Sequence, residues 1–149
     1  MENLFQPAIY ESISARVNQI TPDAKPLWGK MNVAQMLAHC AVAFQVPLSD
    51  KPLKGNFLLR LIGPFFKAQL YNDKPWKQGL PTAPNFIITD ERDFAAEKQN
   101  LLNIISRFYH EGEQGISKHP HPIFGRFTPA QWGQAMYKHL DHHLRQFGQ

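Results

Sequence analysis

Apolar residues recur at the spacing of an α-helix along almost the whole chain, and this pattern constrains the fold more than any other feature. The first stripe ends before Thr21-Pro22, and its members are Phe5, Ile9, Ile13, Val17 and Ile20. Strand signals are confined to the short run Phe86-Ile87-Ile88-Thr89. With 43% hydrophobic and 19% charged residues in 149, the composition is that of one globular domain spanning residues 1–149.

Caps and breaks predict where the next helices begin and end. Asn32 is a good N-cap for a second helix, which ends before Pro47. Its apolar stripe comprises Val33, Met36, Leu37, Cys40 and Phe44. Asp90 is expected to cap a third long helix. The apolar face of this third helix comprises Phe94, Leu101, Ile105 and Phe108.

The last helix carries the strongest start signal. Thr128 is followed by Pro129 at the first helical position and by Gln131 three residues after the cap, which predicts a capping box. Between the second and third long helices, the stretch Phe57–Tyr71 is expected to be helical in part, with a break or kink at Gly63-Pro64. Residues 72–86 are rich in proline and polar residues and predict a long connection. Together these segments predict an all-α fold, an antiparallel four-helix bundle with long loops.

Two histidines lie on the apolar face of the last helix, where imidazoles need polar partners. With about 100° per residue and Trp132 as zero, His139 lies at roughly −20° and His143 at roughly 20°. Residues four apart on a helix bring their side chains to one point. Leaving buried imidazoles unsatisfied costs about 1–3 kcal/mol for each group. The pair therefore indicates a divalent metal site.

A third ligand has to come from another helix if the fourth position is left open for water. His39, on the second helix, is the best candidate. It borders the apolar face of that helix rather than centring it, so the spacing alone also fits an ordinary hydrogen-bonded histidine. The zinc-protease signature needs Glu after the first histidine of the pair. Leu140 stands there, which excludes that class.

Five further residues are candidates for a pocket or for contacts with the metal ligands. His142 lies on the flank of the last helix, and His121 lies in a proline-rich loop that leads to its start. Trp28 and Tyr137 either line a pocket or pack in the core. Arg126, next to the start of the last helix, is a candidate for binding an anionic group.

Charge and hydropathy exclude several function classes. The net charge of +4 is mild and the 16 Lys and Arg residues are spread along the chain, which argues against a nucleic-acid binder. The longest apolar stretch, Phe57–Tyr71, is interrupted by Arg60, Pro64 and Lys67, so we expect no membrane span and no membrane partner. Cys40 is the single cysteine and cannot form an internal disulfide. The first residues have no apolar signal core, so we expect a cytoplasmic protein.

Three segments together resemble the DinB/YfiT-like superfamily, and within it a subfamily without an assigned activity. They are Trp28-Gly29-Lys30-Met31-Asn32-Val33-Ala34-Gln35-Met36-Leu37-Ala38-His39, then His121-Pro122-Ile123-Phe124-Gly125, and finally Trp132 with Tyr137-Lys138-His139-Leu140-Asp141-His142-His143-Leu144-Arg145-Gln146-Phe147-Gly148. The resemblance covers nearly the whole chain, although residues 47–88 contribute little.

The resemblance implies a four-helix bundle that holds a divalent metal (Zn, Ni, Fe or Mn) through His39, His139 and His143. Characterised members of that superfamily include thiol S-transferases that use low-molecular-weight thiols, as well as isomerases and hydrolases of small molecules, and many are dimers. We therefore expect a homodimeric, metal-dependent enzyme with a small-molecule substrate. The alternative is a non-catalytic, stress-related or ligand-binding module whose metal is structural.

Overall fold

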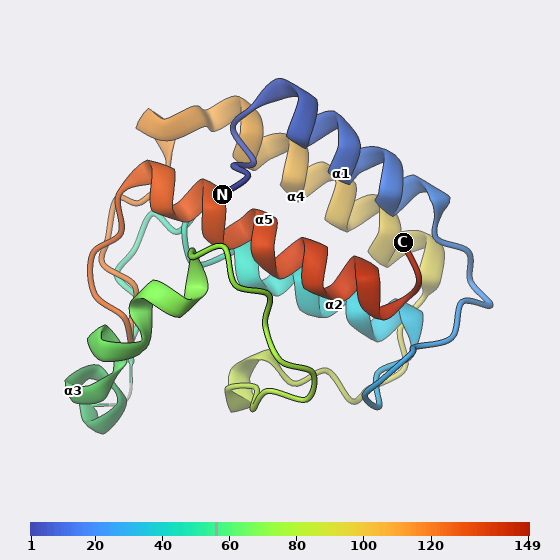
Figure 1. Cartoon of the computed structure of the whole chain (residues 1–149), viewed down its shortest axis with the longest axis horizontal. Coiled ribbons are helices and arrows are strands. Elements are labelled where there is room, and N and C mark those ends of the chain that lie inside the picture. The colour runs from blue at the N-terminus through green and yellow to red at the C-terminus, as the bar shows by residue number, and fades with distance from the viewer. Residues whose placement is uncertain (56) are drawn as a thin grey trace.

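Helices make up the regular structure of the chain in a computed structural model that describes residues 1–55 and 57–149 (Figure 1). The α-helices are α1 (Pro7–Gln19), α2 (Val33–Phe44), α3 (Phe57–Phe66), α4 (Phe94–Gly115) and α5 (Pro129–Gln146). Two short 3-10 helices are η1 (Lys67–Leu70) and η2 (Pro84–Phe86). No strand occurs among the described residues, where an isolated bridge joins His121 and Gly125. The predicted all-α class is confirmed.

The hydrophobic core is enclosed by α1, α2, α4 and α5. In Figure 1, α5 and α2 run side by side, and α1 and α4 lie next to each other. Each of the four contributes a fully buried side chain: Ile13, Phe44, Phe108 and Leu140. The helix α3 lies outside this core, so the described residues form one α-helix more than a four-helix arrangement. The antiparallel four-helix bundle remains a prediction.

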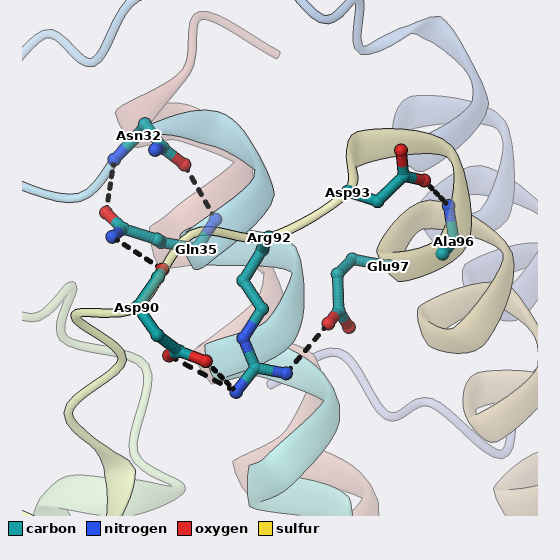
Figure 2. Close-up of polar contacts among 7 residues, drawn as sticks. All are labelled: Asn32, Gln35, Asp90, Arg92, Asp93, Ala96 and Glu97. Atoms are coloured by element: carbon teal, nitrogen blue, oxygen red, sulfur yellow. Dashed lines mark hydrogen bonds and ion pairs between the residues drawn. The ribbon is translucent and has the colours of Figure 1, made fainter.

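Two of the predicted helix starts are confirmed by their hydrogen bonds. The Asn32 side chain accepts a bond from the backbone N–H of Gln35, and the Gln35 side chain accepts one from the backbone N–H of Asn32 (Figure 2). Thr128 and Gln131 form the same reciprocal pair at the start of α5. Each capping box satisfies two N–H groups that the helix itself leaves unpaired. These caps fix where the two histidine-bearing helices begin.

The predicted cap of α4 at Asp90 is wrong, because Asp93 takes that role. The Asp93 side chain accepts a hydrogen bond of 2.7 Å from the backbone N–H of Ala96 (Figure 2). Asp90 instead forms an ion pair of 3.0 Å with Arg92, and its carbonyl accepts a bond from the Gln35 amide. An N-cap must directly precede the first helical residue, which is Phe94.

Of the break or kink predicted at Gly63-Pro64, the break does not occur, since α3 continues to Phe66 with Pro64 inside it. Pro64 lies near the C-terminal end, so the missing N–H affects only the last turn. Gly63 is buried against the loop before α5, and a Cβ atom there would lie 2.4 Å from the Ile123 carbonyl oxygen. None of the described helices is both long and apolar enough to cross a bilayer.

The two aspartates before α4 give a direct test of the cap. Replacing Asp93 by Ala should lower the free energy of unfolding by about 1 kcal/mol, because the N–H of Ala96 loses its acceptor. Replacing Asp90 by Ala should cost only about 0.5 kcal/mol, since it removes an exposed ion pair. Urea unfolding measures both values, and a larger loss for Asp90→Ala would contradict the assignment.

Candidate metal centre

Three buried histidines from two helices form one cluster, and this cluster can hold a metal ion. His39 comes from α2, whereas His139 and His143 come from α5. One ring nitrogen of each lies within 4.8 Å of the others. Their side chains are almost fully shielded from solvent, with exposed fractions of 5%, 8% and 8%. The predicted pair on α5 and the candidate on α2 thus meet inside the protein.

Hydrogen bonds on the far side of two rings determine which nitrogen faces the cluster. The Nδ1 atom of His39 lies 2.8 Å from the carbonyl oxygen of Phe86, which only accepts, so Nδ1 carries the proton. The Nδ1 atom of His143 lies 2.8 Å from the Oε1 atom of Gln146. The amide of Gln146 is oriented by its own bond to the Trp28 carbonyl. In both rings the Nε2 lone pair is therefore left for the interior of the cluster.

The Nε2 atoms of His39 and His139 face each other at 3.0 Å. Two lone pairs at this distance repel, so a proton or a cation has to lie between them. Two imidazoles on a tetrahedral zinc, each bound at about 2.0–2.1 Å, would be about 3.3 Å apart. The Nδ1 atom of His139 is buried without a hydrogen-bond partner. The spacing thus fits two ligands of one ion.

Burial keeps these imidazoles neutral, which is the form that binds metals. Desolvation lowers the pKa of His39, although the bond to Phe86 opposes this shift. Desolvation, followed by the neighbouring imidazoles, lowers the pKa of His139 well below its usual range. For His143 the same causes lower the pKa to about 3. The cluster therefore presents uncharged nitrogen donors at neutral pH.

An aromatic pocket lies beside the cluster. Its volume is about 70 Å³, and its lining residues are Trp28, Pro75, Trp76, Gln78, Lys138, Asp141, His142 and Arg145. The ring of His142 has its centroid 5.6 Å from that of Trp28 and 5.6 Å from that of Trp76. The Trp76 ring also lies 5.8 Å from that of His139. Trp76 therefore borders both the pocket and the histidine cluster.

A buried lysine fixes the connection that carries Trp76. Lys138 directly precedes His139, and its ammonium group donates to the carbonyl oxygens of Gln69 and Asn72 and to the Asn72 side chain. The indole N–H of Trp76 donates to the same Gln69 carbonyl at 2.8 Å. The segment from η1 to Trp76 is thus tied to α5 next to a member of the cluster.

Three of the residues predicted for the site, His121, Arg126 and Tyr137, do not line the aromatic pocket. His121 packs on Trp132, seven residues or about 10 Å along α5 from His139. Its Nδ1 atom accepts the N–H groups of Ile123 and Phe124, and burial lowers its pKa to about 4. The side chain of Arg126 is exposed, and its carbonyl accepts a bond from Lys67.

Tyr137 lines a second hollow, which adjoins the aromatic pocket and shares Pro75, Lys138 and Asp141 with it. It is half-buried and lines a cavity of about 300 Å³ near the N-terminus, together with Met1 and Asp73. Of the predicted pocket residues, only Trp28 and His142 therefore lie beside the cluster.

Three contributors to the site were missed by reasoning from the sequence. Gln146 lies three residues after His143 on α5, and this spacing was a usable signal. Trp76 lies in the proline-rich connection, where no periodicity reports on position. The Phe86 carbonyl is a backbone group, which residue types do not reveal.

Comparisons with known proteins give one match. The family described as "Protein of unknown function (DUF1569)" matches residues 9–149, a range that includes all three histidines of the cluster. No curated protein matches this chain. No solved structure matches it either.

Acid should destabilise the metal-free protein in a defined pH range. His121 and His143 have folded-state pKa values of about 4 and about 3, below the ordinary 6.5. From pH 6.5 down to these values the unfolded chain binds protons that the folded chain excludes, so the free energy of unfolding falls as pH is lowered from about 6.5 to about 3. Urea unfolding in the presence of a chelator measures this decline. His143→Gln should make it shallower, and a flat profile would contradict the neutral cluster.

Proposed function

The chain belongs to the DUF1569 family, and we propose that it is a divalent-metal-dependent enzyme acting on a small molecule. In this proposal His39, His139 and His143 hold the ion. The observation that carries it is the 3.0 Å approach of two buried imidazole Nε2 atoms, each on a neutral ring. A cation between them would bind both Nε2 lone pairs, in place of the single proton that this contact otherwise requires.

The donor set supports an open rather than a closed metal site. Structural zinc normally has four protein ligands, whereas catalytic zinc has three and an exchangeable position. The metal-competent group among the described residues contains three histidines. The next imidazole, His142, is placed between two tryptophan rings. Imidazole donors suit Zn, Ni and Fe, while Mn prefers oxygen ligands and is the least favoured.

The residues around the cluster suggest how a substrate would be held. A bound ion would lower the pKa of a coordinated water or thiol toward neutrality and so supply a nucleophile. Trp28 and Trp76 offer aromatic faces and exclude water. Arg145 lines the same pocket, and its nearest carboxylate oxygen, on Asp141, is 3.8 Å away. We assign to Arg145 the recognition of an anionic group, in place of the role expected for Arg126.

The proposal extends to fold and reaction type. The resemblance to the DinB/YfiT-like superfamily implies one histidine ligand on the second helix and two on the last helix. The two on the last helix are four residues apart. We therefore propose a DinB-like homodimer whose reaction is of the thiol S-transferase kind, with a low-molecular-weight thiol as one substrate. Neutral imidazoles beside an aromatic pocket support binding of a thiolate and its electrophilic partner.

A structural metal is the second candidate, and one observation favours it. The Trp76 ring lies against His139, and none of the three histidines lines the aromatic pocket. A purely structural ion needs no path to solvent. The two functions differ in whether an added thiol can reach the ion. In cobalt-substituted protein, binding of a thiol to the ion would change the visible absorption spectrum.

Metal uptake should depend on three histidines and not on the others. Tag-free protein should bind about one equivalent of zinc by elemental analysis and by titration calorimetry. His139→Ala or His143→Ala should abolish uptake, and His39→Ala should weaken it strongly. His142→Ala should have a smaller effect, and His110→Ala, at an exposed position, is the matched control. Equal losses in all five variants would refute the assignment.

The hydrogen bond from Gln146 should tune metal affinity. Gln146→Leu removes the acceptor that orients His143, and loss of such a partner weakens metal binding by about ten- to a hundredfold. Gln146→Glu keeps an acceptor at this position and should recover most of the affinity. Competition with a chromophoric chelator measures both variants. An unchanged affinity for Gln146→Leu would mean that the bond does not orient the ligand.

Catalysis is tested with the metal-loaded protein and a panel of thiols paired with electrophiles. Turnover should require the ion and should disappear in His143→Ala. Trp76→Ala should alter KM more than metal affinity, because Trp76 borders the pocket without binding the ion. A protein that binds one equivalent of metal, shows no spectral change with any thiol and turns over no pair would support the structural alternative.

A further inference from the structure

Large apolar side chains on α3 face solvent. The exposed fractions are 73% for Phe57, 69% for Leu58, 59% for Leu61 and 85% for Phe65. Leu59, Ile62 and Phe66 are also exposed, at 39%, 52% and 52%, so at about 100° per residue the exposed apolar positions span more than half of the helix circumference. Gly63 lies on the opposite side and is buried against Ile123. The face is therefore turned away from the protein, and in Figure 1 α3 lies apart from the helices of the core.

The segment that carries this face has charged residues of one sign. Residues 51–72 contain four basic residues and no Asp or Glu. Lys67 is engaged with the Arg126 carbonyl and lies over the ring of Phe127. Lys51, Lys54 and Arg60 are exposed, and no carboxylate pairs with them within the described part of the chain. The surface is therefore complementary to a partner that is both apolar and negatively charged.

We propose that α3 is an interfacial helix that binds the surface of an anionic lipid bilayer. Helices of this kind lie in the plane of the interface, with Phe and Leu in the acyl region and Lys or Arg at the phosphates. A second copy of the chain fits less well. A two-fold axis would bring the same basic residues of both copies together without an acidic partner.

The anchoring of α3 suits this role. Its inner side is held at Gly63, and the Lys67 ammonium group ties the following turn to the loop before α5. The outer face can thus enter the interface while the core of the protein stays in water. The histidine cluster does not contribute to this surface, so the proposal is independent of the proposed function.

Vesicle flotation with the full chain tests the proposal. The protein should bind vesicles of phosphatidylcholine mixed with phosphatidylglycerol and should bind pure phosphatidylcholine far less. Leu61→Glu combined with Phe65→Glu should reduce partitioning by more than about tenfold. Lys54→Gln and Arg60→Gln should each reduce it about fivefold, and added salt should do the same.

Matched controls separate the outcomes. Leu27→Glu replaces a leucine that is 70% exposed outside α3 and should leave binding unchanged. Zinc uptake and thermal melting report whether each variant is folded. Absence of vesicle binding, or equal binding to neutral and anionic vesicles, would overturn the proposal. So would a dimer, detected by analytical ultracentrifugation without lipid, that the Leu61 and Phe65 substitutions dissociate.

Discussion

The orientation of the histidine cluster depends on polar groups that reach it from three separate segments. The Phe86 carbonyl fixes one ring, Gln146 fixes His143, and the Trp28 carbonyl in turn orients Gln146. The bonds to His39 and His143 lie on the sides of their rings that face away from the cluster. The irregular connections between the helices therefore supply the groups that orient the imidazoles, in addition to covering the core.

This dependence explains a close approach near the start of α2. Gly29 has a φ of 83°, and a Cβ atom there would lie 2.6 Å from the Gln146 amide nitrogen. The same turn is held by a 2.8 Å bond from the N–H of Leu27 to the Gln146 carbonyl. Glycine is thus needed both for the backbone conformation and for the space that Gln146 occupies. The geometry of the histidine cluster therefore constrains Gly29, which is not a member of it.

The sequence predicted the parts of this structure that repeat or that obey short-range rules. Periodicity located the core faces of α2, α4 and α5, and the spacing of His139 and His143 indicated a shared point. The cap of α4 was misplaced because Asp90 and Asp93 are both acceptable residue types, and only the start of the helix distinguishes them. Trp76 and the Phe86 carbonyl were missed because tertiary contacts alone bring the 72–86 connection to the cluster.

Lys138 connects α5 to the segment that carries Trp76. Its three acceptors lie in the segment that carries Trp76, and its own backbone adjoins that of His139. A shift of His139 along or around α5 would strain these bonds and displace the indole. The position of α5 and that of the Trp76 indole are in this way connected through one lysine side chain.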